Sequence, residues 1–141
     1  MGMSAKEYLQ QLQKYKRTAQ LYAERIEELY HEATGIKAIV YDKDRVQVSP
    51  EDRMEKIFMR IDSEAEKYTK ARARYDREVR KRVEMIASLE NPAHVELLTL
   101  RYVDGLKWEE IACAMGYTFR HTTRLHGDAL GAFGRRFKDV L

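Results

Sequence analysis

The residue types that most often carry chemistry are sparse in this sequence of 141 residues, and their spacing argues against a metal site. Cys113, His121 and His126 come nearest to a metal-ligand set. The two histidines are five residues apart, about 140° around a helix, so they do not converge as an i, i+4 pair would. We therefore expect no metal, a polar packing or surface role for His126, and a small, half-buried packing role for Cys113.

The sequence also gives no sign of an enzyme. It shows no nucleophile beside a base, no glycine-rich phosphate loop and no converging pair of carboxylates, so we expect neither catalysis nor a cofactor. Its unbalanced charges lie near the end of the chain, where residues 118–138 hold five Lys or Arg and one acid, Asp128. Cations along a helix can meet DNA phosphates, and arginine in the major groove pairs with guanine. We predict base contacts from Arg120, His121, Thr123 and Arg124, and phosphate contacts from Lys107, Tyr117, Thr118, Arg135 and Arg136.

Three helices predicted in residues 91–141 must position these side chains. Asn91-Pro92 is typical of a helix start, and Asp104-Gly105 of a helix end, which gives a helix over residues 93–103. A short helix over residues 108–115 ends at Gly116, and Thr118 caps the last helix. Two helices at a sharp glycine turn, completed by a third, make a helix-turn-helix module. We assign its core to Trp108, Ile111, Ala112, Gly116, Thr122 and Leu125.

At these residues the segment LRYVDGLKWEEIACAMGYTFRHTTRLHGDAL resembles region 4 of sigma-70-type RNA polymerase sigma factors. It is still more similar to phage-encoded, sigma-region-4-like regulators of about this size. The likeness rests on Leu100-Arg101-Tyr102, Trp108 to Ala112, Gly116-Tyr117, Arg120-His121 and Arg124 to Gly127. It implies double-stranded DNA in contact with the last helix, RNA polymerase as a candidate second partner, and the cytoplasm of a bacterial host as location.

Two departures limit that resemblance. Thr122 stands where sigma region 4 usually has Val or Ile; the shape is similar, but the hydroxyl implies a slightly weaker core. Nothing in residues 1–90 resembles the aromatic, strand-melting region 2 of a sigma factor. The resemblance therefore implies a DNA-binding regulator or a partial sigma factor, which does not open a promoter alone.

The first 34 residues have the pattern of a helix that packs along a partner helix. Apolar and aromatic residues recur every seven positions, a heptad seam of Ala5, Tyr8, Leu12, Tyr15, Ala19, Tyr22, Ile26, Leu29 and Ala33. Ser4 and Glu7 resemble a capping box, and Gly35 is a natural terminator. Residues 36–48 alternate β-branched and polar residues, which suits a short β-hairpin or an extended loop.

A second helix of about 40 residues is predicted from Ser49-Pro50 onward. Its seam consists of Met54, Phe58, Ile61, Ala65, Tyr68, Arg72, Tyr75, Val79, Arg82, Ile86 and Leu89. The two seam arginines could fix the register of helix pairing. Residues 67–82 hold eight Lys or Arg and two acids, which is either a solvated face or a phosphate-contacting flank. The first helix, folding back antiparallel, is the expected companion of the second.

Together these patterns predict an all-α protein with two parts. Residues 1–90 form a long, coiled-coil-like antiparallel helical hairpin suited to oligomerisation, and residues 91–141 form a helix-turn-helix module of sigma region 4 type. The composition agrees, because 44% of residues are apolar, 35% are charged and only 2 are proline. One cysteine and no apolar run of about 20 residues favour a reduced, cytoplasmic setting without membrane contact.

Three functions fit this organisation. The first is a phage-like transcriptional regulator that works as a homodimer or with RNA polymerase. The second is a DNA-packaging protein similar to a small terminase subunit, which uses the helix-turn-helix for DNA and the hairpin to oligomerise. The third is an interaction module without a DNA function, whose helical arm binds another protein.

Overall fold

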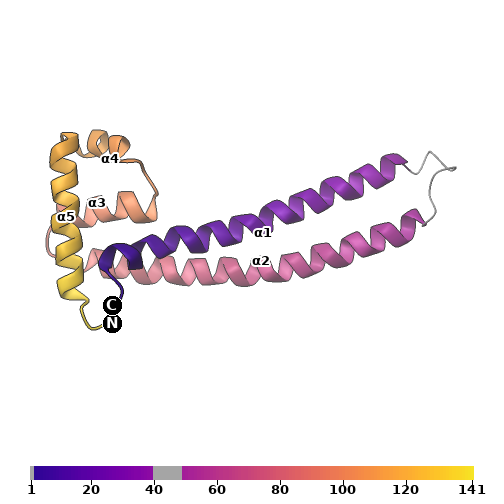
Figure 1. The fold of residues 1–141 in the computed structure, drawn as a ribbon, viewed down its shortest axis with the longest axis horizontal. Helices are drawn as coiled ribbons and strands as arrows, with labels where there is room; N and C mark the ends of the chain where they lie inside the picture. The colour runs from indigo at the N-terminus through magenta and orange to yellow at the C-terminus, as the bar shows by residue number, and fades with distance from the viewer. Residues whose placement is uncertain (1, 40–48) are drawn as a thin grey trace. The chain divides into compact units, whose positions relative to one another are not determined.

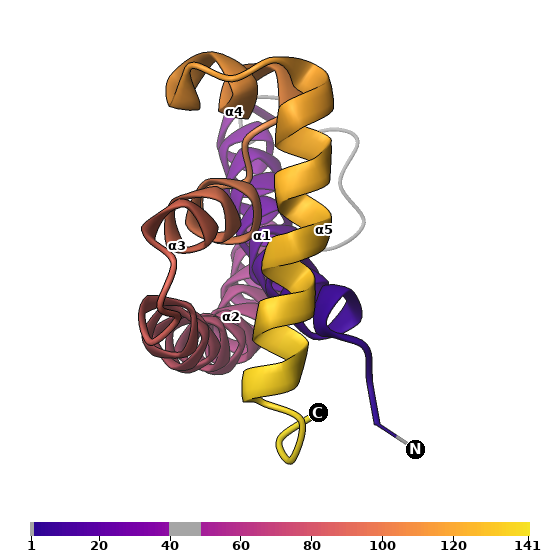
Figure 2. The ribbon, with the colours of Figure 1, turned by 90° about the vertical axis from the view of Figure 1, so that its left-hand side faces the viewer.

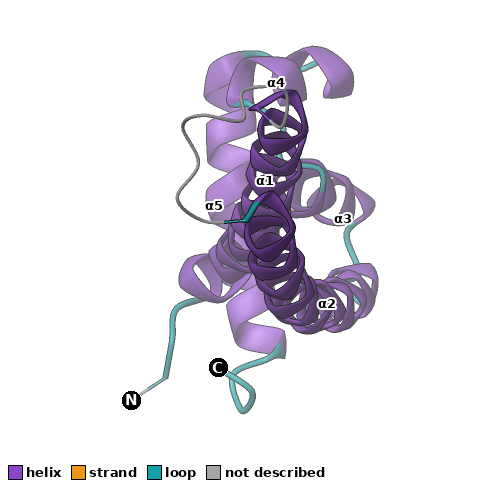
Figure 3. Ribbon diagram, turned by 90° about the vertical axis from the view of Figure 1, so that its right-hand side faces the viewer, coloured by secondary structure: helices purple, strands orange, loops and turns teal. Residues whose placement is uncertain are grey.

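The computed structural model describes residues 2–39 and 49–141, and all regular structure in those two ranges is helical (Figures 1 and 3). The all-α prediction is confirmed. No helix in the described ranges is long and apolar enough to cross a membrane. In chain order the helices are α1 (Ala5–Ile39), α2 (Pro50–Ala87), α3 (Pro92–Leu98), the π-helical turn η1 (Thr99–Val103), α4 (Trp108–Met115) and α5 (Phe119–Arg136).

The chain forms two compact units, and both long helices contribute to each of them. The two-helix unit consists of residues 16–74, and the multihelical unit consists of residues 1–15 and 75–141. The first turns of α1 and the last turns of α2, predicted to be part of the arm, therefore contribute to the same unit as α3, α4 and α5.

The predicted helix starts are confirmed by hydrogen bonds at each cap. The Ser4 hydroxyl accepts from the backbone N–H of Glu7 at 3.1 Å, and the Glu7 carboxylate accepts from the N–H of Ser4 at 3.3 Å. The side-chain oxygens of Ser49, Asn91 and Thr118 accept from backbone N–H groups two or three residues on, at 3.3, 2.9 and 3.1 Å. Each bond satisfies a donor that the first helical turn leaves unpaired.

In the two-helix unit, α1 and α2 run side by side in opposite directions (Figure 1). Leu29 and Ala33 pack with Ile57 and Ile61, and Ile26 and Met54 flank this cluster. The seam predicted for α1 is confirmed, because its residues are buried or half-buried. At the edge of the unit, Arg25 pairs with Glu64 at 3.9 Å and Arg60 with Glu32 at 4.0 Å.

The seam predicted for α2 is wrong at two positions. Phe58 is 48% exposed, and its neighbour Ile57 is 4% exposed and occupies the core instead. A heptad seam alternates steps of three and four residues, and both orders fit the sequence at this point. Only packing against the partner helix therefore decides whether Ile57 or Phe58 is buried. Arg72, also assigned to the seam, is exposed.

Gly35 does not end α1, contrary to the prediction, since the helix continues to Ile39. A glycine inside a helix costs only about 1 kcal/mol relative to alanine, which the hydrogen bonds of the following turn offset. Residues 36–39 are therefore helical, and neither strand nor loop. Residues 40–48, the rest of the predicted β-hairpin or loop, lie outside the described part of the chain.

The multihelical unit has a core to which both ends of the chain contribute, and Figure 2 shows the start of α1 beside α5. Its buried residues are Tyr8, Leu9, Ile86, Leu89, Leu97, Leu98, Tyr102, Ile111, Ala129 and Phe133. The helix α5 runs unbroken past Gly127, Gly131 and Gly134 to Arg136. A Cβ at Gly134 would lie 3.9 Å from the Cβ of Ala5, which shows how closely α5 approaches the start of α1.

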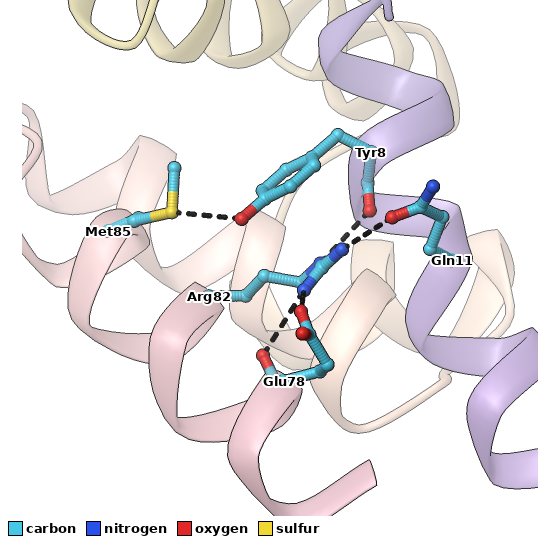
Figure 4. A network of polar contacts seen from close by, with 5 residues as sticks. All are labelled: Tyr8, Gln11, Glu78, Arg82 and Met85. Atoms are coloured by element: carbon cyan, nitrogen blue, oxygen red, sulfur yellow. Dashed lines mark hydrogen bonds and ion pairs between the residues drawn. The ribbon is translucent and has the colours of Figure 1, made fainter. Parts of the chain in front are cut away.

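A buried arginine links α1 and α2 within this unit (Figure 4). Arg82 is 1% exposed. Its guanidinium donates to the carbonyl of Tyr8 at 3.0 Å and to the side-chain oxygen of Gln11 at 2.7 Å, and it pairs with the carboxylate of Glu78. It also lies 3.9 Å from the centre of the Tyr8 ring, close enough for a cation–π contact. The Tyr8 hydroxyl donates to the sulfur of Met85 at 3.3 Å, so these contacts fix the register of the two helices.

Candidate nucleic-acid interface

A tight glycine turn joins α4 to α5. Gly116 ends α4 with φ of 70°, in the left-handed region that favours glycine. The N–H of Tyr117 donates to the carbonyl of Ala112 at 2.9 Å, which closes the end of α4. Thr118 then caps α5 through its hydroxyl. The chain thus reverses over three residues and presents the first turns of α5 beside the end of α4.

The residues assigned to the helix-turn-helix core hold this pair of helices together. Ile111 and Thr122 are fully buried and Ala112 is 8% exposed, whereas Trp108 and Leu125 pack against the core and stay partly exposed. The hydroxyl of Thr122 donates to the carbonyl of Thr118 at 2.9 Å. Burial of that hydroxyl therefore leaves no unpaired hydrogen-bond donor.

The four side chains assigned to base contacts lie on the exposed surface of the first turns of α5: Arg120, His121, Thr123 and Arg124. The two arginines are four residues apart and so share one side of the helix. The His121 ring meets the Tyr117 ring edge-on, with centroids 4.5 Å apart. The start of α5 therefore combines two arginines with the positive end of a helix dipole, a combination that attracts a polyanion.

The side chains assigned to phosphate contacts fall into two separate groups. Lys107, Tyr117 and Thr118 are exposed in the segments that precede α4 and α5. Arg135 and Arg136 are exposed at the other end of α5, about 16 Å beyond Arg124 at 1.5 Å per residue. Arg136 donates to the hydroxyl of Ser88 at 2.9 Å.

The second group belongs to a different surface feature. Both of its arginines line a hollow of about 410 Å³ whose other walls are Leu89, Glu90, Asn91, His94 and Ala132. The structure thus places Tyr117 and Thr118 directly before the predicted base contacts, whereas Lys107 lies at the other end of α4 and Arg135 and Arg136 lie at the other end of α5.

His126 is half-buried in the multihelical unit and is a polar packing residue, one of the two roles predicted for it. Its ring lies 4.4 Å from the Trp108 ring, centre to centre, and its Nε2 is 2.7 Å from the Tyr102 hydroxyl. Burial, together with the positive charges of Lys6 and Arg101, lowers the pKa of His126 to about 4. Burial also raises the pKa of the Tyr102 hydroxyl. The phenol and the imidazole are therefore both neutral at pH 7, and the tautomer of the imidazole decides which of them donates.

The residues that suggested a metal do not form a site. Cys113 is exposed, which corrects the half-buried position predicted for it, because it points away from the face on which Ile111 and Ala112 pack. Across residues 2–39 and 49–141 no three His, Cys, Asp or Glu side chains lie close enough together to hold a metal ion.

The sequence pattern assigned no role to one exposed side chain that lies beside the predicted base contacts. Phe119, the first residue of α5, is 57% exposed. Helical spacing could have identified Phe119, because this large apolar residue falls outside the inward stripe of Thr122, Leu125 and Ala129.

No protein-family model matches the chain, and the comparisons with curated proteins and with solved structures found no match either.

Proposed function

We propose that this chain is a sequence-specific DNA-binding transcriptional regulator. In this proposal α4 and α5 are the two helices of a helix-turn-helix, α3 with η1 completes the module, and the first turns of α5 enter the major groove. The observation that carries it is the pair Arg120 and Arg124, exposed one helical turn apart immediately after a glycine turn. Arginine in the major groove hydrogen-bonds to guanine through two nitrogen donors.

The resemblance of residues 100–130 to sigma region 4 supports the same assignment. It adds a phage or prophage origin, a bacterial host cytoplasm and contact with RNA polymerase as further parts of the proposal. The part formed by α1 and α2 is proposed as a hairpin arm that joins two copies. Phe58 and Met59 favour that role, because they are 48% and 64% exposed on α2 and would lose contact with water in a dimer.

The experiment is selection of a bound duplex from a random pool, followed by titration of single variants. Arg120→Ala and Arg124→Ala should each weaken binding to the selected duplex by about 1–3 kcal/mol and relax the preference at one base pair. Lys56→Ala, which removes an exposed cation of the two-helix unit, is the matched control and should change little. Failure to select any sequence, or binding that does not weaken with added salt, would contradict the proposal.

A second candidate function, DNA packaging, rests on the same exposed apolar residues of α2. Light scattering of the purified protein separates the two. A dimer supports the regulator, whereas a ring of eight or more copies supports a packaging protein.

A further inference from the structure

The exposed side of α5 carries two different strips, one basic and one apolar. Arg120 and Arg124 form the basic strip, and Phe119 and Thr123 form the apolar strip. Within each strip the two residues are four apart, so they lie about 6 Å apart along the helix axis. The two strips are about 100° apart around the helix, the angle between consecutive residues, and both lie on its exposed side.

The exposure of Phe119 requires an explanation. A ring that is 57% exposed at the start of a helix gains little from folding, and it adjoins cations that stay in water. The same position is favourable if a partner surface covers the ring. The adjacent arginines indicate the charge of that partner, since an apolar patch beside two cations complements an anionic surface that also carries apolar groups.

The hydroxyl of Thr123 is already used within the helix. It donates to the carbonyl of Phe119 at 3.0 Å, so its proton is not available to a ligand. Thr123 is nonetheless exposed. Its γ-methyl group is therefore the part of the side chain best suited to a new contact, and it extends the apolar strip that Phe119 begins.

We infer that Phe119 and Thr123 select thymine by contact with its 5-methyl group, while Arg120 and Arg124 pair with neighbouring guanines. This inference rests on the proposed function. The thymine methyl is the apolar group that a base pair presents in the major groove, and phenylalanine and the threonine methyl both suit it. The 6 Å between the two residues of a strip is close to two base-pair steps of about 3.4 Å. The target should therefore carry two thymines about two steps apart, next to guanines.

The first test uses the selected duplex with each thymine replaced in turn by deoxyuridine, which removes only the methyl group. We expect two positions at which binding weakens about fourfold, equivalent to about 0.8 kcal/mol for one buried methyl. Phe119→Ala should weaken binding to the thymine duplex and abolish the effect of uracil at one of them. Uracil without effect at every position, while the duplex is still bound tightly, would overturn this inference and leave the proposed function standing.

A matched pair of variants at Thr123 separates the methyl group from the hydroxyl. Thr123→Val keeps a methyl and should still distinguish thymine from uracil. Thr123→Ser keeps the hydroxyl and should bind about fourfold more weakly and lose that distinction. The opposite ranking would show that the hydroxyl makes the contact and would refute the methyl assignment. Unchanged DNA affinity of Phe119→Ala would refute the thymine contact of the ring, and failure to select any duplex would overturn both the inference and the proposed function.

Discussion

Loss of the Arg82 side chain should strongly destabilise the multihelical unit. It is 1% exposed, and its guanidinium donates hydrogen bonds to the Tyr8 carbonyl and the Gln11 amide oxygen and pairs with the Glu78 carboxylate. Truncation to alanine leaves the amide oxygen of Gln11 without this donor, at about 1–3 kcal/mol, and a carboxylate that is 28% exposed without its partner, whereas the Tyr8 carbonyl keeps its hydrogen bond within α1. Breaking a buried ion pair on one side costs about 3–5 kcal/mol, so Arg82→Ala should lower the free energy of unfolding by about that amount.

Urea unfolding followed by the fluorescence of Trp108 measures this directly. Trp108 is the one tryptophan of the chain and belongs to the same unit as Arg82. The control is Arg80→Ala, at an exposed position two residues away, which should change the free energy of unfolding by less than about 0.5 kcal/mol. In the Arg82→Ala background, Glu78→Ala should cost less than it does in the natural chain, because the two residues share one interaction. A loss below about 1 kcal/mol for Arg82→Ala would refute the assignment of register and stability to this network.

Three further predictions concern pH, backbone conformation and capping. The pKa of His126 is about 4 when folded and 6.5 when unfolded, so the unfolded chain binds the extra proton between those values. Stability to urea should therefore fall as the pH drops from about 6.5 to about 4, and His126→Gln should flatten that slope. Gly127→Ala, at a helical position where an added Cβ meets nothing, should stabilise the fold by about 1 kcal/mol, whereas Gly116→Ala should destabilise it because of its positive φ. A lower melting temperature for Gly127→Ala would contradict this. Asn91→Ala should cost about 1 kcal/mol by removing the cap of α3, and an unchanged urea midpoint would show that another group replaces it.

Local features of the fold followed directly from the residues. The starts of the helices at Ser4, Ser49, Asn91 and Thr118 were predictable, because a cap bonds to a backbone group only two or three residues away. The left-handed turn at Gly116 was equally local. The end of α1 was not predictable, since one glycine does not decide it.

In the candidate interface, too, some features could be predicted from the sequence and others required the structure. The exposure of Arg120 and Arg124 could be inferred from helical spacing relative to Thr122 and Leu125. The use of the Thr123 hydroxyl within the helix, and the extent to which the Phe119 ring is exposed, required the structure. Both change which chemical groups the start of α5 exposes for the DNA contact proposed above.

By itself, the sequence determined that the chain is helical, where most helices begin, and which face of each helix is apolar. These properties depend on hydrogen bonds and side-chain spacings within a few residues. Only the tertiary structure decided that Ile57 and not Phe58 is buried, that Phe133 and Leu9 share one core, and that Arg82 is enclosed by α1. Those outcomes depend on surfaces contributed by residues far apart in the chain, because burial stabilises a side chain only where a complementary partner covers it.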